Sequence, residues 1–187
     1  MINHLRPALT LVVAMTALTG LAYPLAMNGI AQAVMPAKAN GSLIERDGRV
    51  IGSALIGQNF ASERYFWPRP SATGPDPYNA AASSGSNLGT TSVKLKDRVT
   101  ADVARLTETG IAQPVPADAV TTSGSGLDPH ISPAFAEAQV ARVAQARGLD
   151  PSAVASLVAQ HTEIPTFGVI GQARVNVLEL NLALDAR

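Results

Sequence analysis

Three residue types associated with nucleophilic catalysis lie close together in the segment Ser123-Gly-Ser-Gly-Leu-Asp-Pro-His130. Serine, aspartate and histidine can form a catalytic triad, in which histidine removes the serine proton and aspartate orients the histidine. Triad members are usually distant in sequence, and this segment lacks the Gly-x-Ser-x-Gly turn that exposes a nucleophilic serine. Its glycines, serines and proline are typical of a turn that leads into a helix. We therefore interpret the segment as structural.

Glycine-rich segments suggest a second kind of chemistry, the binding of a phosphate group. Gly52 and Gly57 have the spacing of the start of a P-loop, but no Gly-Lys-Ser/Thr follows them. Residues 83–89 (Ser-Ser-Gly-Ser-Asn-Leu-Gly) come shortly before a helix expected after Ser92, so their amides could face an anion. Many serine and glycine turns have this composition without a ligand. The sequence favours a structural turn and leaves a ligand contact open.

Metal binding and redox chemistry have little support in the composition. The chain has no cysteine, which excludes disulfides, thiolate metal sites and a cysteine nucleophile. Its three histidines are isolated, and its aspartates form no Asp-x-Asp-x-Asp calcium pattern. Lys plus Arg (14) equals Asp plus Glu (14), so no charge excess indicates a nucleic-acid partner. We expect a non-catalytic chain without a metal cofactor.

The longest apolar segment lies at the N-terminus. The residues between Arg6 and Lys38 carry no charge, and residues 8–25 alone form a helix of about 27 Å, close to the thickness of a bilayer core. We predict a cytoplasmic N-terminus over residues 1–6 and a transmembrane helix over residues 7–34. The alternative is a cleaved signal peptide ending at the small-x-small triplet 37–39. Both alternatives place the remainder outside the cytoplasm, although the flanking charges give this orientation only weak support.

Residues 38–187 contain nearly all the charges and predict one small soluble, extracytoplasmic domain. Leu43–Arg46 and Arg49–Ile51 flank Asp47-Gly48, which is a strong hairpin signal, and we expect the second strand to continue through Ile56. Residues 57–91 are rich in proline, glycine and serine. Their aromatic content favours an ordered loop over a disordered linker. The aromatic residues are Phe60, Tyr65, Phe66, Trp67 and Tyr78.

The second half of the domain carries three clear helix starts. Ser92, Ser132-Pro133 and Asp150-Pro151 are N-cap signals, and they predict helices from residue 93 to about 109, from 133 to 147 and from 151 to about 161. The tail over residues 174–185 alternates like a strand at first, and its later leucine spacing suits a helix equally well. The predicted fold class is α+β, a single N-terminal transmembrane helix followed by one small mixed α/β soluble domain.

Beyond these patterns, long strings of residues resemble a known family, the C subunit of Kdp-type potassium-transporting ATPases (the KdpC family). The strings occur in the family's order over nearly the whole chain, and several are long and uncommon. A small departure is Ser83-Ser84, where Ser-Gly is common. The matching residues are 5–9, 23–24, 39–44, 52–60, 65–66, 69–72, 78–79, 84–88, 114–116, 120–133, 139–149, 162–163 and 171–185.

The resemblance implies membership of an ATP-driven potassium importer in the bacterial inner (cytoplasmic) membrane. The expected partners are a channel-like subunit, an ATP-hydrolysing P-type subunit and a very small peptide subunit. The family keeps its N-terminal helix, which favours the retained anchor. Its C subunit is held to do no chemistry itself, to stabilise assembly and to act as a catalytic chaperone that raises the ATP affinity of the pump subunit.

ATP is therefore the one cofactor that the resemblance implies. Ser84, Gly85, Ser86, Asn87 and Leu88 would stand in for the nucleotide-signature loop of transporter ATPases, with Gln139 as a further contact. The lack of a lysine-bearing phosphate loop and the extracytoplasmic orientation argue against tight binding of ATP by the domain itself.

Two further hypotheses stay open beside ATP binding. In the first, which we favour, the domain is a structural scaffold or cap on the channel-like subunit, without nucleotide contact. Its partner interface would then be the five aromatic residues of the 57–91 loop. The second is an unrelated exported binding protein with a cleaved N-terminus.

Overall fold

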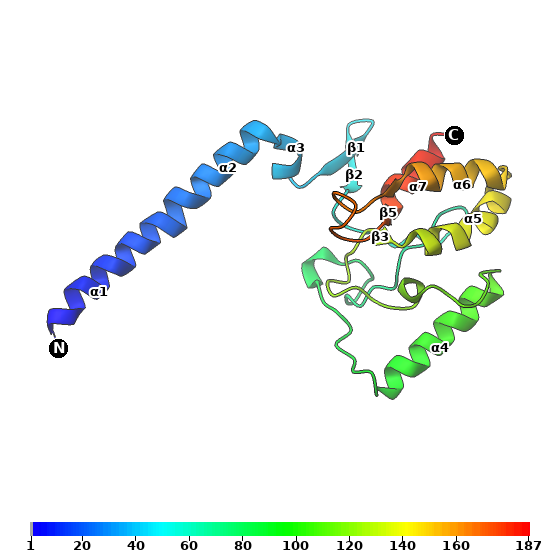
Figure 1. Ribbon diagram of the computed structural model, residues 1–187, viewed down its shortest axis with the longest axis horizontal. Helices are drawn as coiled ribbons and strands as arrows, with labels where there is room; N and C mark the ends of the chain where they lie inside the picture. Colours follow the sequence, from blue (N-terminus) through cyan, green and yellow to red (C-terminus); the bar gives the residue numbers. More distant parts are fainter. Residues whose placement is uncertain (1) are drawn as a thin grey trace. The chain divides into compact units, whose positions relative to one another are not determined.

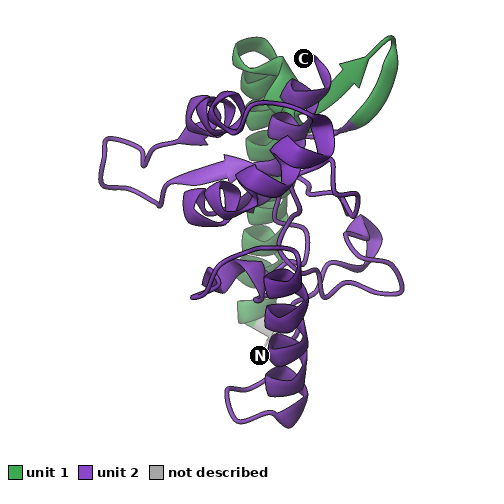
Figure 2. Ribbon diagram, turned by 90° about the vertical axis from the view of Figure 1, so that its right-hand side faces the viewer, with its two compact units in different colours: residues 1–51 green, residues 52–187 purple. Residues whose placement is uncertain are grey.

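The computed structural model describes residues 2–187, which divide into two compact units, one that ends at Ile51 and one over residues 52–187 (Figure 2). The first unit holds the N-terminal helices and most of a hairpin. The second unit is a mixed helix and sheet domain. The boundary lies at Gly52, within the second strand of the hairpin.

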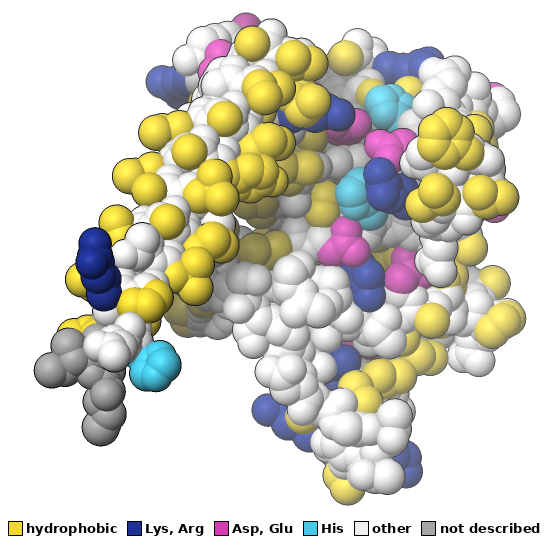
Figure 3. Space-filling model, turned by 60° about the vertical axis from the view of Figure 1, so that its left-hand side comes forward, with side chains coloured by type: hydrophobic (Ala, Val, Ile, Leu, Met, Phe, Trp, Pro, Cys, Tyr) yellow, Lys and Arg dark blue, Asp and Glu magenta, His cyan; other side chains and the backbone are white. Residues whose placement is uncertain are grey.

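The N-terminal unit begins with a long rod of helix (Figure 1). Helix α1 (Ile2–Met15) continues through a π-helical segment, η1 (Thr16–Ala22), into α2 (Tyr23–Val34). The stretch Asn3–Val34 is long and apolar enough to cross a membrane, and none of the residues in its apolar window is buried. Apolar side chains cover the rod in Figure 3. Thr10 and Thr19 donate hydrogen bonds to the carbonyls of Arg6 and Met15, which satisfies their hydroxyls within the helix.

The π-helical segment has a local cause in Pro24. Proline has no backbone N–H, and its ring collides with the carbonyl four residues earlier, so it disturbs the preceding turn of a helix. The backbone N–H of Tyr23 donates to the carbonyl of Leu18, five residues earlier, instead of the usual four. Pro24 is thus accompanied by a wider turn of the helix just before it.

A short helix and a hairpin follow the rod. Helix α3 (Pro36–Ala39) leads to strands β1 (Leu43–Arg46) and β2 (Arg49–Ser53), which pair as a two-stranded sheet. Asp47 (φ 52°) and Gly48 (φ 73°) both take the left-handed conformation, so the predicted two-residue turn is confirmed. The expected continuation of β2 through Ile56 is wrong. The chain turns at Ala54-Leu55, where the Ser53 hydroxyl accepts a hydrogen bond from the Leu55 N–H.

The second unit is built on a small antiparallel sheet of three strands. Strand β5 (Arg174–Asn176) lies between β3 (His130–Ile131) and β4 (Thr162–Glu163), so the order is β3-β5-β4. Val175 pairs with Ile131 on one side and with Thr162 on the other. Because the strands are two or three residues long, the sheet provides little surface of its own. Helices supply most of the core.

Four helices complete this unit, and the predicted caps begin three of them. They are α4 (Val93–Glu108), α5 (Pro133–Arg147), α6 (Pro151–Gln160) and α7 (Val177–Asp185). Side chains of Ser92, Ser132 and Asp150 accept N–H groups of the first turns of α4, α5 and α6, as predicted. The tail contains both predicted alternatives, since β5 runs directly into α7 and Asn176 is its N-cap.

The hydrophobic core of the second unit lies between the helices and the sheet. Its fully buried side chains include Leu106, Phe135, Val143, Val175 and Leu180, which come from α4, α5, β5 and α7. Two short 3-10 turns, η2 (Ala80–Ala82) and η3 (Ala117–Ala119), lie in the long connections. The predicted mixed α and β class is confirmed, and the long loop over residues 57–91 supplies part of the core.

Candidate functional site

Two buried amide side chains hold the aromatic segment, residues 60–67, in the core. Asn181 on α7 accepts the N–H of Phe66 (2.8 Å) and donates to its carbonyl (3.0 Å). Gln139 on α5 does the same for Trp67, with distances of 2.7 Å and 3.2 Å. Each amide thus pairs with one residue as a neighbouring strand would. Because all these groups are buried, leaving any of them unpaired would be costly, so the segment is fixed in place.

Two arginines of α5 reinforce this arrangement. Arg142 donates to the carbonyls of Glu63 (2.7 Å) and Tyr65 (3.1 Å) and to the Gln139 side chain (2.6 Å), and its guanidinium lies 3.7 Å from the centre of the Trp67 ring. Burial lowers the pKa of Arg142 to about 10, while Glu63 opposes the shift, so the side chain stays charged at neutral pH.

Arg147 makes an equivalent set of contacts five residues later on α5. It donates to the carbonyls of Arg64 and Leu184 and to the Asp185 carboxylate, and it lies over the Tyr65 ring at 4.9 Å. The Tyr65 hydroxyl donates to the same carboxylate. Both arginines also contact carboxylates, those of Glu63 and Asp185, and their side chains are only 6% and 7% exposed.

The five aromatic residues of the expected partner interface fall into two groups. Phe66 (0% exposed) and Trp67 (8% exposed) belong to the core of the unit. Phe60, Tyr65 and Tyr78 are half-buried, and the Phe60 and Tyr65 rings pack together at 5.3 Å between their centres. A partner could therefore reach the second group directly, whereas the first group acts by shaping the surface.

A cavity of about 300 Å³ lies beside this aromatic segment. Its wall combines aromatic, proline and charged side chains, including Phe60, Trp67, Tyr78 and Arg105. Arg105 comes from α4, lies 5.7 Å from the Trp67 ring and has a side chain that is 54% exposed. Aromatic and proline walls with a nearby cation are suited to bind a protein segment or an apolar group.

A polar network joins the loop over residues 57–91 to the Ser123–His130 segment. The Asp128 carboxylate contacts the Arg69 guanidinium and the His130 ring, each at 3.1 Å. Burial favours the neutral acid, but hydrogen bonds from His130 and the charge of Arg69 outweigh it and lower the pKa of Asp128. Tyr78 donates to the Arg69 carbonyl (2.6 Å), and burial raises the pKa of its hydroxyl.

The serines of the same segment have structural partners. Ser123 accepts the N–H of Gly126 (2.9 Å), and Ser125 accepts the N–H of Leu127 (3.1 Å). Both are turn contacts, as the structural interpretation predicted. The contact of the His130 ring is with Asp128. Asp118, Asp128, His130 and Arg174 are among the charged and histidine side chains that line a second cavity, of about 540 Å³. Figure 3 shows acidic, basic and histidine side chains side by side on one face.

The proposed ATP-binding residues lie in two different environments. Ser84, Gly85, Ser86, Asn87 and Leu88 form no regular element and run beside residues 123–126, where the Ser84 N–H donates to the Ser125 carbonyl (3.0 Å). Ser84 and Asn87 are exposed, and the other three are half-buried. Gln139 is 0% exposed and contacts the aromatic segment instead. The hydrogen bonds of Gln139 therefore connect it to Trp67 and Arg142, and the Ser84 N–H connects the 84–88 loop to Ser125.

Sequence reasoning missed Asn181 and the role of the two arginines. Asn181 lies in a leucine-rich tail. A polar residue among the apolar residues of a buried helix needs a hydrogen-bond partner, and this requirement was the signal that could have identified it. The residues of the described chain bring together no group of three or more His, Asp and Glu side chains that could hold a metal ion.

Comparison with known proteins identifies the family. The family model described as "KdpC: K+-transporting ATPase, c chain" matches residues 5–186. The chain belongs to the KdpC family. The predicted resemblance is thus confirmed over both units, from the N-terminal rod to the end of α7.

Individual KdpC relatives are similar over nearly their full lengths. Each of the following is called a potassium-transporting ATPase KdpC subunit. The relative from Methylorubrum populi is 57% identical (99% of this chain, 98% of the relative), that from Polaromonas naphthalenivorans 60% (98% and 95%), and that from Allorhizobium ampelinum 58% (100% and 97%). Family membership makes this chain a subunit of a potassium-transporting ATPase, and hence a protein with partner subunits.

Proposed function

We propose that this chain is a non-catalytic accessory subunit that stabilises the assembly of the potassium-transporting ATPase. Its anchor would be the helix over residues 7–34, retained in the inner membrane, with residues 1–6 in the cytoplasm and residues 38–187 outside it. The apolar rod and the names of the KdpC relatives support this proposal. The expected partners are the channel-like subunit, the ATP-hydrolysing P-type subunit and the small peptide subunit.

The observation that carries the assembly role is the fixed aromatic segment. Gln139, Arg142 and Asn181 use their hydrogen bonds to hold this segment, which leaves the half-buried Phe60 and Tyr65 at a rigid surface next to a cavity. Rigid aromatic side chains lose little conformational freedom when a partner covers them, and they often dominate interfaces. The domain would thus cap the channel-like subunit and hold the complex together.

The test is co-purification of the complex with substitutions on the rim of the cavity. Phe60→Ala combined with Arg105→Ala should reduce the amount of partner subunits recovered with the tagged chain at least fivefold, because both side chains are partly exposed. Lys96→Ala, an exposed position on the same helix as Arg105, should leave recovery unchanged. Full recovery of the complex with the double variant would remove this surface from the interface.

A second proposal concerns the ATP affinity of the pump subunit, the chaperone role. Exposed Ser84 and Asn87 offer a hydroxyl and an amide that could contact a nucleotide. Gln139, being enclosed, would influence ATP affinity through the position of Trp67. Asn87→Asp keeps a residue that tolerates the left-handed backbone (φ 52°) and adds a charge that repels phosphate.

The assembled complex carrying Asn87→Asp should then need a higher ATP concentration for half-maximal activity. Gln145→Glu makes the same amide-to-carboxylate change on an exposed position of α5 and is the matched control. The same ATP requirement in the two variants would argue for the purely structural role.

A further inference from the structure

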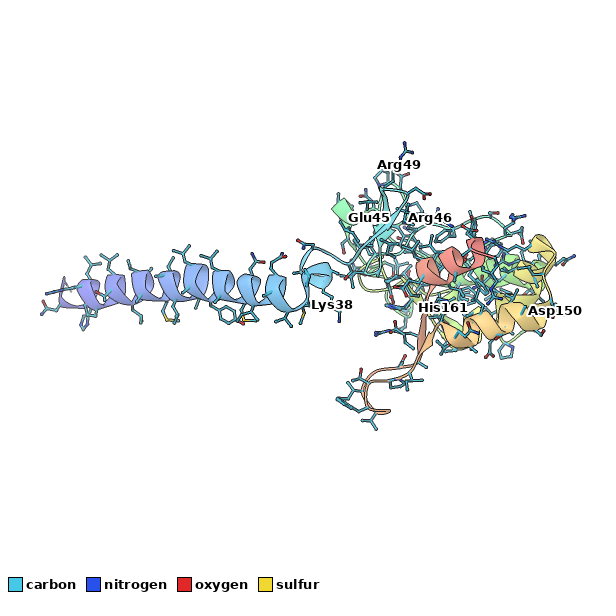
Figure 4. All side chains as sticks on the ribbon, turned by 90° about the horizontal axis from the view of Figure 1, so that it is seen from above. Lys38, Glu45, Arg46, Arg49, Asp150 and His161 are labelled. Carbon is cyan, nitrogen blue, oxygen red and sulfur yellow. The ribbon has the colours of Figure 1, made fainter. Side chains whose placement is uncertain are left out.

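A hairpin between β4 and β5 presents the most exposed apolar side chains of the second unit. It projects away from the helices of this unit, as the orange loop in Figure 4 shows. We call residues 164–170 the apolar hairpin. Ile164 is 79% exposed, Phe167 89%, Val169 81% and Ile170 63%. Four large apolar side chains are thus exposed within seven residues, and such a concentration of exposed apolar groups usually marks an interaction site.

The apolar hairpin is closed by its own hydrogen bonds. The Thr166 N–H donates to the Ile170 carbonyl (2.9 Å), the Ile170 N–H returns to the Thr166 carbonyl (3.0 Å), and the Gly168 N–H donates to Pro165 (2.9 Å). At its base, Glu163 and Arg174 form an ion pair at 2.8 Å. The tip is therefore preformed, and binding it would require little ordering.

The charges of the unit decide which kind of partner suits this surface. No Asp, Glu, Lys or Arg lies between Glu163 and Arg174, and Arg174 is already paired. Residues 52–187 contain ten Lys and Arg against twelve Asp and Glu, a net charge of −2. Attachment to an anionic lipid surface gains strength from cationic residues, which are lacking here. An uncharged apolar groove on a protein complements a preformed apolar tip better.

The segment between the rod and the second unit is short, which keeps the apolar hairpin near other subunits of the same membrane. Only the 17 residues from Met35 to Ile51 separate the apolar rod from the second unit, so the unit stays within about 60 Å of the end of the rod. A subunit in the same membrane is thus present at a high effective concentration.

We propose that the apolar hairpin docks into an uncharged apolar groove on another subunit of the same ATPase complex. This inference rests on the proposed assembly role and goes further, because it names a second contact, separate from the aromatic segment. Phe167 would be the central side chain of that contact, with Val169 and Ile170 beside it.

A photo-crosslinking amino acid at Phe167 tests the identity of the partner. p-Benzoylphenylalanine would replace Phe167 in the complete complex, in native membranes, and Val93, which is 70% exposed on α4, would be the control position. Irradiation should give a covalent product with another subunit from position 167 and little or none from position 93. A product with lipid alone, a product with a second copy of this chain, or no product in an intact complex would overturn the inference.

A triple variant tests whether the contact matters for assembly. Phe167→Ser, Val169→Ser and Ile170→Ser together should lower recovery of partner subunits at least fivefold with an unchanged Tm. Leu55→Ser and Val93→Ser remove exposed apolar side chains elsewhere and should have no effect. Undiminished recovery with the triple variant would overturn the hairpin contact alone. Failure of the unmodified chain to co-purify would instead overturn the assembly role.

Discussion

At the scale of single residues, Gln139 is a candidate ligand contact whose side chain also has a structural role. Its side chain accepts from the Trp67 N–H and from Arg142, and donates to the Trp67 carbonyl. These contacts use both ends of the amide, and the side chain has no exposed surface. A substitution at this position should therefore act mainly on the conformation of the aromatic segment, and any effect on ligand binding should follow from that change.

Gln139→Ala should lower the free energy of unfolding by about 2–4 kcal/mol, because it leaves buried backbone and guanidinium groups unpaired. Chemical denaturation of the full chain in detergent would measure this loss. Gln145→Ala removes the exposed glutamine of the same helix and should cost under about 0.5 kcal/mol. Equal stability of the two variants would mean that the Gln139 contacts contribute nothing.

At the scale of elements, two loops that are distant in sequence form one unit. Residues 84–88 run beside residues 123–126. A Cβ atom at Gly126 would lie 2.7 Å from the Ser84 carbonyl oxygen and 2.7 Å from the Thr73 side chain. Gly126 also has φ 69°, which side chains other than glycine rarely adopt. The approach of the two loops thus depends on glycine at this position.

Gly126→Ala should destabilise the chain by more than about 2 kcal/mol, since left-handed strain and overlap with backbone atoms add together. The shift in the midpoint of thermal or chemical unfolding would measure the loss. Gly89→Ala is the matched control, because nothing lies within 4 Å of a Cβ there. A variant at Gly126 as stable as the control would show that the two loops can separate without cost.

The helix starts could be predicted from sequence because their signals are local. Ser92, Ser132 and Asp150 each lie within three residues of the N–H group that they accept. A short sequence motif therefore includes both partners of the hydrogen bond. The pairing of Asn181 with Phe66 spans 115 residues, and that of Gln139 with Trp67 spans 72. No short sequence motif includes both partners of such contacts. The sequence therefore predicts that the loop over residues 57–91 is ordered, but it does not predict which residues of this loop are buried.

At the scale of the whole molecule, an apolar rod and a mixed domain belong to one chain with few flanking charges. Figure 4 labels Lys38 after the rod and Arg46 and Arg49 in the following hairpin, while Arg6 lies near the start of the rod, in α1. Since positive charges occur on both sides, they select the orientation only weakly. The apolar length of the rod is the stronger feature.

Single-cysteine labelling in intact cells should place the two ends of the rod on opposite sides of the membrane. The natural chain has no cysteine, so Ala155→Cys on an exposed position of α6 provides a single thiol. It should react with a membrane-impermeant maleimide once the outer membrane is opened. Asn3→Cys should stay unreactive until the cells are lysed. The reverse pattern would place the domain in the cytoplasm and favour direct contact with ATP.

Trp67 is the only tryptophan of the chain, and its position has a spectroscopic consequence. Its indole is buried, and the guanidinium groups of Arg142 and Arg105 lie 3.7 Å and 5.7 Å from the centre of its ring. Intrinsic emission excited at the red edge of protein absorption therefore comes from one place. Loosening of the aromatic segment would move the emission maximum to longer wavelength as water reaches the indole. The protein thus carries its own fluorescent reporter in the buried layer beneath the surface where we expect its partners to bind.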